Sequence, residues 1–194
     1  ELIVELLNDI KSFLSSKEYL IYIFPTNSEF IIKKMDGCSG FLAGKNIMHV
    51  YLYPKRNWKS NFKSTLLHEF AHCMQPYYSY KMNVFEHLIA EGLAEHFQMA
   101  FIKKRSPWTK SISKKDAIKI FKGLIDNINK NMEKNYSFHN ALFFGNNKYP
   151  LWSGYTIGFY LVEDILKEKK KINWKEILRK NPLSFKNKLK NWFY

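Results

Sequence analysis

The side chains most able to do chemistry lie between Thr65 and His72, where the chain reads T-L-L-H-E-F-A-H. Within this stretch, His68, Glu69 and His72 form the pattern H-E-x-x-H. If the stretch is helical, the two histidines lie one turn apart on the same face. Two neutral imidazoles at that spacing can bind one Zn²⁺, with Glu69 beside the metal rather than on it. The pattern therefore predicts zinc-assisted hydrolysis, with Glu69 as the general base that takes a proton from water.

A third zinc ligand is expected downstream, because a zinc hydrolase usually has three protein ligands and one position left for water. Glu91 follows His72 by 19 residues, which is enough chain for a turn and the start of a second helix. Glu95 comes one turn later, where it can accept a hydrogen bond from a ligating histidine and fix its tautomer. We expect one Zn²⁺ per chain, bound by His68, His72 and Glu91. An exchange of roles between Glu91 and Glu95 stays open, as does a ligand or a purely structural role for His87.

The alternative interpretation is a solvated helix surface that carries histidine and glutamate by chance. Two sets of apolar residues argue against it. The set with helical spacing around H-E-x-x-H is Leu66, Leu67, Phe70, Ala71 and Met74. The set around the two glutamates is Gly92, Leu93, Ala94 and Phe97. Both sets favour helices with buried faces.

H-E-x-x-H followed by a glutamate at this spacing resembles the gluzincin group of zinc peptidases, which includes thermolysin. The metzincin group differs, since it carries Gly and a third His where this chain has Gln75 and Tyr78. More closely, the chain resembles the YjaZ-like family of predicted zinc-dependent proteases. The matching blocks are H-E-F-A-H (His68–His72), L-I-A-E-G-L-A-E-H-F (Leu88–Phe97) and P-L-W-S-G-Y-T-I-G-F-Y-L-V (Pro150–Val162). The resemblance implies a zincin-like fold and a zinc peptidase that acts on a peptide or protein substrate.

The resemblance also implies an edge strand just before the zinc helix, which holds extended substrate by strand addition. Ile47–Tyr53 is the candidate for this strand. His49 on it could face the cleft or simply fill the sheet. In the third matching block, Tyr155 could donate a hydrogen bond to the oxyanion of the tetrahedral intermediate. In the alternative interpretation, Tyr155 and Tyr160 are core aromatics.

The elements that must position these residues form a mainly helical α+β fold with a small N-terminal sheet. Before the zinc helix we expect, in order, a helix, a strand, a short helix, a turn-rich segment and a second strand. They span Glu1–Ser15, Tyr19–Phe24, Glu29–Met35, Asp36–Lys45 and Asn46–Tyr53. The zinc helix is expected to begin near Trp58–Lys63 and to end before Pro76. The capping pair Asn83 and Glu86 predicts the next helix over Val84–Ile102.

The second half of the chain is expected to contain a third long helix, a loop-like segment, two further helices and a basic amphipathic end. Ser113 and Asp116 are expected to cap the third long helix, which carries Ile118, Phe121, Ile125 and Ile128. The loop-like segment is Asn127–Asn147, with an aromatic patch at Phe138–Phe144. The two further helices are Gly154–Leu166 and a short helix capped by Asn173 and Glu176, and the basic end is Ser184–Tyr194. The Asn127–Asn147 segment is a candidate lid or specificity loop. No repeat or linker divides the chain, so we expect a single zincin-like metallopeptidase domain over residues 1–194.

The composition is that of a folded protein with a strong positive charge. The 194 residues are 46% hydrophobic and 17% aromatic, which excludes intrinsic disorder. The net charge of +14 could serve nucleic acid, an anionic membrane surface or an acidic partner. No nucleic-acid-binding motif with a usable spacing is present, so we expect no specific nucleic-acid partner and a peptide or protein substrate that can be acidic. Two other classes stay open: a catalytically inactive zinc-binding regulatory protein, and a basic protein associated with nucleic acid or membranes.

Cys38 and Cys73 are the only cysteines, and we expect both to be free thiols in a reducing compartment. Cys73 is not expected to bind zinc, because the residue after His72 points away from the face that carries the two histidines. No apolar run reaches the ~18 residues that a membrane span needs. We therefore expect a cytoplasmic protein without a transmembrane segment. The chain begins at Glu1 without Met, so its N-terminus can have been trimmed or processed.

Overall fold

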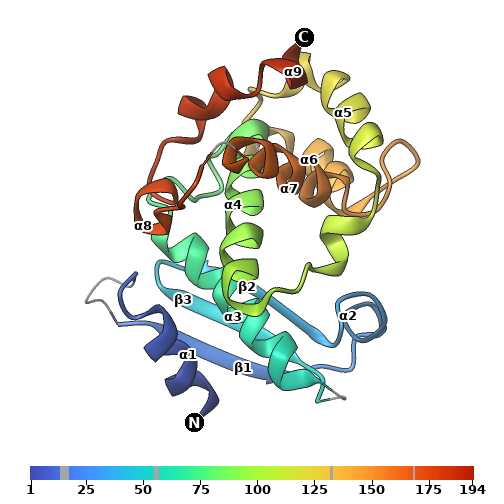
Figure 1. Ribbon diagram of the computed structural model, residues 1–194. Helices are drawn as coiled ribbons and strands as arrows, with labels where there is room; N and C mark the ends of the chain where they lie inside the picture. Colours follow the sequence, from blue (N-terminus) through green and yellow to red (C-terminus); the bar gives the residue numbers. More distant parts are fainter. Residues whose placement is uncertain (14–17, 55–56, 132, 168) are drawn as a thin grey trace.

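The computed structural model describes residues 1–13, 18–54, 57–131, 133–167 and 169–194. It shows a mainly helical α+β fold in which a small sheet lies at one end and most of the helices gather at the other (Figure 1). The predicted fold class is thereby confirmed. The two termini lie at opposite ends of the molecule (Figure 1).

The strands and helices have the following bounds. The strands are β1 (Leu20–Pro25), β2 (Cys38–Gly44) and β3 (Ile47–Leu52). The α-helices are α1 (Leu2–Ile10), α2 (Glu29–Lys34), α3 (Trp58–Met74), α4 (Val84–Ile102), α5 (Lys114–Lys122), α6 (Tyr136–Phe144), α7 (Ser153–Leu166), α8 (Trp174–Ile177) and α9 (Lys190–Phe193). The 3-10 helices in the described part of the chain are η1 (Pro107–Lys110), η2 (Ile125–Asn127), η3 (Glu133–Asn135) and η4 (Pro182–Lys188).

The sheet has the strand order β1-β3-β2. β3 pairs in parallel with β1 and antiparallel with β2, so it lies in the middle of the sheet. The prediction that Ile47–Tyr53 forms an edge strand is therefore wrong. The edge strand that packs against the zinc helix α3 is β2.

β2 lies in the segment that the sequence indicates as turn-rich, and that prediction is wrong for Cys38–Gly44. Asp36 and Gly37 do form a turn, with φ angles of 55° and 80°. Gly40, however, has a packing role instead of a turn role. A Cβ atom at Gly40 would lie 2.7 Å from Cγ2 of Thr65 on α3, so only glycine lets the strand approach the helix this closely.

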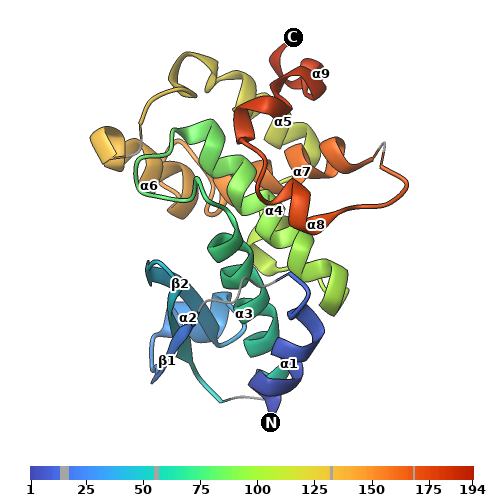
Figure 2. The same ribbon diagram turned by 90° about the vertical axis from the view of Figure 1, so that its left-hand side faces the viewer.

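The two faces of the sheet differ in what covers them. α1 and α3 lie on one side of the sheet (Figure 2), and Met48 and Val50 of β3 are buried in the core. The other face carries exposed aromatic side chains, among them Tyr22 and Phe41. Because side chains alternate along a strand, His49 lies on this second face, away from α3.

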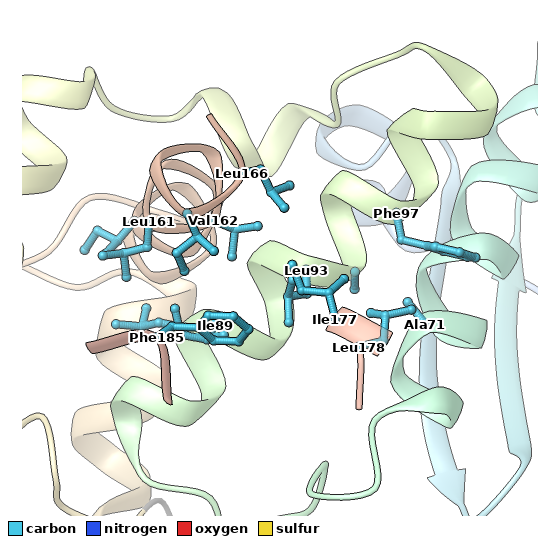
Figure 3. Packing of buried hydrophobic residues seen from close by; sticks show 14 of the residues in the cluster. Ala71, Ile89, Leu93, Phe97, Leu161, Val162, Leu166, Ile177, Leu178 and Phe185 are labelled. Carbon is cyan, nitrogen blue, oxygen red and sulfur yellow. The ribbon is translucent and has the colours of Figure 1, made fainter. Parts of the chain in front are cut away.

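The helices at the far end pack around a close crossing of α4 and α7. A Cβ atom on Gly92 would overlap the carbonyl group of Gly158, and one on Gly158 would overlap the carbonyl oxygen of Leu88. Large apolar side chains of both helices fill the core around this crossing (Figure 3). They include Ile89 and Leu93 of α4 and Leu161 and Val162 of α7. Two glycines thus allow the backbone contact that fixes the angle of α4.

Several helix predictions are confirmed. α3 and α4 have the expected bounds, and α7 begins one residue before the expected Gly154. Asn83 and Glu86 form the predicted capping box, since the Glu86 N–H donates to Asn83 Oδ1 at 2.9 Å and the Asn83 N–H donates to Glu86 Oε2 at 2.8 Å. The first helix is shorter than predicted, because it ends at Ile10 and residues 11–13 form a turn; the predicted helical residues Leu14 and Ser15 lie outside the described residues.

Two predictions in the second half of the chain are corrected. The third helix is shorter than expected, because α5 ends at Lys122 before Gly123 and Ile125 lies in η2. The Asn127–Asn147 segment is not one loop, because its aromatic patch forms α6, with His139, Leu142 and Phe143 buried. Apolar packing against the core therefore overrides the weak helical pattern of this segment. None of the described helices is long and apolar enough to cross a membrane.

Candidate metal centre

The centre is built by the two packed helices α3 and α4. α3 carries His68, Glu69 and His72, and α4 carries Glu91 and Glu95. All five residues are at most 7% exposed. Apolar neighbours on both helices lie in the same core, so the polar side chains are held in a dry environment where each needs a partner.

Three of these side chains point at a common centre. His68 Nε2 lies 3.0 Å from His72 Nε2 and 3.1 Å from Glu91 Oε2. His72 Nε2 lies 3.5 Å from Glu91 Oε1. A tetrahedral zinc ion with bonds of about 2.0–2.1 Å would separate its ligand atoms by about 3.3 Å. The two nitrogens are thus close to this separation from each other, and each is close to it from a different oxygen of Glu91. His68, His72 and Glu91 are the group able to hold a metal ion in the described part of the chain.

The charge of this group also suits a cation. Burial opposes the ionisation of Glu91, but His72, His68 and His87 outweigh it and hold the pKa of Glu91 well below its usual range. Glu91 is therefore a carboxylate. Two nitrogen donors and one anionic oxygen donor are the ligand types that zinc takes in hydrolases.

Glu95 lies beside this group rather than in it. Its Oε1 is 2.9 Å from His68 Nδ1, on the opposite side of the ring from the nitrogen that faces Glu91. The same oxygen accepts a hydrogen bond of 2.6 Å from Trp108 Nε1. His68 is thus held between two glutamates, one at each ring nitrogen.

Gln75 has the matching position beside His72. Its Oε1 is 2.9 Å from His72 Nδ1, and its side-chain amide donates to the carbonyl oxygen of Ala90 at 3.0 Å. An amide oxygen only accepts, so His72 donates from Nδ1 and keeps the lone pair of Nε2 for a metal. The sequence does not predict this role, because Gln75 follows the last residue of α3 and no helical spacing points to it.

Glu69 lines a pocket of about 110 Å³ that opens at the three donor atoms. Burial raises the pKa of Glu69, and the nearby His68 and His72 act in the opposite direction. β2 confines this side chain, since a Cβ atom on Gly40 would lie 3.0 Å from Glu69 Cγ. The carboxyl group is thus held next to the donor atoms without being one of them.

Aromatic residues make up much of the remaining pocket lining: Phe41, Tyr78, Trp108, Phe144, Trp152 and Tyr155. Tyr155 borders the pocket and also packs edge-on against Phe143, with ring centroids 5.0 Å apart. Burial and the carboxylates of Glu91, Glu69 and Glu95 raise the pKa of Tyr155, so its phenol is protonated at neutral pH. Its hydroxyl group can therefore act as a hydrogen-bond donor in the pocket.

Tyr78 is a site residue that the sequence analysis does not assign. Its ring stacks on His72, with centroids 4.0 Å apart and planes 27° apart, and its hydroxyl donates to Glu91 Oε1 at 3.4 Å. Tyr78 and His72 also line a groove of about 1020 Å³ that adjoins the pocket at these two residues. The charged side chains Lys45 and Arg179 line the same groove.

The other histidines and the cysteines lie outside the group of donor atoms. His49 packs among Tyr22, Phe24 and Phe41 on the outer face of the sheet, with ring centroids 5.2–5.5 Å away. Both cysteines are free. Burial raises the pKa of Cys38 to about 11 and that of Cys73 to about 12, so both side chains are thiols at neutral pH, as expected from the sequence.

A family model described as "Predicted Zn-dependent protease (DUF2268)" matches residues 1–187 of the chain. No curated protein and no solved structure matches the chain.

Proposed function

The chain belongs to the family of predicted Zn-dependent proteases, and from this premise we propose that it hydrolyses peptide bonds at one zinc ion bound by His68, His72 and Glu91. The family match agrees with the resemblance that the three sequence blocks carry. The observation that supports the proposal most is the convergence of two histidine nitrogens and the Glu91 carboxylate, with contacts of 3.0–3.5 Å, and Glu69 beside them in the same pocket. A zinc site kept only for structure would usually have four protein ligands and would not need this glutamate.

Zinc in such a centre supplies a Lewis acid that polarises a carbonyl group and makes water a better nucleophile at neutral pH. The chain's own residues do the rest. Glu69 accepts the proton of the attacking water on its carboxylate and passes it to the leaving amine. Glu95 and Gln75 orient the two ligating histidines. Tyr155 donates its phenolic proton in a hydrogen bond to the oxyanion.

The substrate is an extended peptide that crosses the centre. β2 is an edge strand whose residues Ser39, Gly40 and Phe41 line the pocket, so a peptide can add to the sheet there through backbone hydrogen bonds. The aromatic pocket wall favours a large apolar side chain on one side of the cleaved bond. Lys45 and Arg179 favour acidic side chains on the other side, in the larger groove.

The direct test is digestion of a peptide library by the zinc-loaded chain, with the products identified by mass spectrometry. We expect cleavage next to large apolar residues, loss of cleavage after zinc is removed with a chelator, and recovery when one equivalent of zinc is added back. The zinc-free chain treated in parallel is the control. Stoichiometric zinc without cleavage of any peptide in the library would contradict a peptidase and favour a zinc-binding protein without catalytic activity.

A further inference from the structure

Two buried histidines outside the proposed zinc ligands form a line that ends on Glu91. His87 lies on α4, one turn before Glu91, and its Nε2 is 2.9 Å from Glu91 Oε1. His139 lies on α6, and its Nε2 is 2.5 Å from His87 Nδ1. His87 is 6% exposed and His139 is 8% exposed. A hydrogen-bonded chain therefore runs from α6 through α4 to the carboxylate.

The direction of these hydrogen bonds follows from the acceptor at the end of the line. Glu91 is ionised and can only accept, so His87 donates from Nε2. If the Nδ1 of His87 carries no proton, its lone pair accepts a hydrogen bond and His139 donates from its own Nε2. Burial, with the neighbouring His87, lowers the pKa of His139 to about 3, which keeps this ring neutral at physiological pH.

Packing around α6 restrains both rings. The ring of Phe143 stacks on His87 and on His139, with centroids 4.5 Å apart in each case. Phe143 in turn fits against α7 at Gly154, where a Cβ atom would lie 2.8 Å from the Phe143 ring. The place of His139 is thus set by the docking of α6 on α7.

The contacts of the Glu91 carboxylate divide between its two oxygen atoms. Oε1 accepts from His87 at 2.9 Å and from Tyr78 at 3.4 Å. Oε2 is directed at His68 Nε2, 3.1 Å away, and Oε1 also lies 3.5 Å from His72 Nε2. Anchoring one oxygen limits rotation of the carboxyl group, so less conformational freedom remains to be lost when the other oxygen binds a metal ion.

We propose that His87 and His139 are positioning residues that hold the Glu91 carboxylate in its metal-binding orientation. The proposal rests on the zinc site of the proposed function, but not on the peptidase activity. It has a reciprocal consequence, because a contact that aids zinc binding is itself stabilised by zinc. Zinc should therefore protect the amides of α6 from hydrogen exchange, although no proposed ligand lies on that helix.

The test compares two substitutions at His139 in the full-length chain. His139→Gln can place an amide N–H near the position of the lost Nε2, whereas His139→Leu has similar size and no donor. Zinc affinity is measured by competition with a chromophoric chelator. We expect His139→Leu to weaken zinc binding about 10-fold, the lower end of the range for residues that orient metal ligands, and His139→Gln to stay within about 3-fold of the unsubstituted chain.

His96→Leu is the matched control. His96 also lies on α4, but its Nε2 donates to the carbonyl oxygen of Phe159 at 3.0 Å. It should leave zinc affinity within about 2-fold, because its hydrogen bond does not reach the metal ligands. Thermal unfolding of the zinc-free chains gives the cost of each substitution to the fold alone.

The results separate the possible explanations. Equal weakening by Gln and Leu at position 139 would assign the effect to packing and overturn the proposal, as would unchanged affinity in both. Imidazole ¹⁵N spectra of the unsubstituted chain test it without any substitution. A proton on Nε2 of both His87 and His139 is expected, and a proton on Nδ1 alone in His87 would refute it. If zinc binding depends on His139 but the chain cleaves no peptide, the positioning role is supported and the proposed peptidase function is contradicted.

Discussion

Replacing Glu69 by Gln is expected to lower kcat roughly 10²–10⁴-fold, the usual contribution of a positioned general base, while the chain still binds one zinc ion. The amide has the shape of the carboxyl group but cannot accept the proton of water. Glu69 is 5% exposed and is not among the three donor atoms, so the substitution removes a proton acceptor without removing a ligand. The measurement is peptide hydrolysis under saturating substrate, beside the zinc content of the same sample.

Glu29→Gln is the matched control for this experiment. It makes the same chemical change on α2, where Glu29 forms an exposed ion pair with Lys33 at 2.8 Å. It should leave kcat unchanged, because exposed ion pairs contribute little to stability and this one is outside the pocket. A Glu69→Gln chain that keeps most of its activity with zinc bound would show that another group removes the proton.

Replacing Glu91 by Ala is expected to weaken zinc binding by more than the 10–100-fold that is typical for residues that only orient a ligand. Without this carboxylate, the metal ion would keep only the two imidazole nitrogens, which lie 3.0 Å apart, and would lose the anionic ligand of the set. Glu95→Gln should fall within the 10–100-fold range instead, because Glu95 contacts the far nitrogen of His68. Chelator competition on the two chains measures both effects.

This pair of substitutions also decides which of the two glutamates binds zinc and which one orients His68. Zinc loss with Glu95→Gln and tight zinc binding with Glu91→Ala would exchange their roles. His68→Ala is expected to lose zinc in either case. Retention of stoichiometric zinc by His68→Ala would refute the ligand set as a whole.

The parts of the site that the sequence predicts are those with a local periodic signal. His68 and His72 are four residues apart on one helix, and Glu91 and Glu95 repeat the spacing on the next, so helical geometry alone brings each pair to one face. The capping box at Asn83 marks the start of α4 to the residue. The bounds of α3 and α4, and the residues that share a face on each, therefore follow from the sequence without tertiary information.

The parts that the sequence does not predict depend on contacts between distant segments. Gly40 suggests a turn, but its lack of a side chain instead lets β2 lie against Thr65. His139 has no recognisable partner in the sequence, because His87 is 52 residues away and the two meet only when α6 docks. Trp108 reaches Glu95 from η1, which follows a break in the helix. In each case the useful signal is a packing or hydrogen-bonding need that only the folded chain displays.

The measurement that tests the account most directly is the position of zinc in crystals of the zinc-loaded chain, located by anomalous scattering at the zinc absorption edge. We expect one peak per chain, about 2.0–2.2 Å from His68 Nε2, His72 Nε2 and an oxygen of Glu91, with Glu69 next to the zinc ion but not bound to it. A peak at His49 or at the thiols, or no peak between α3 and α4, would contradict it.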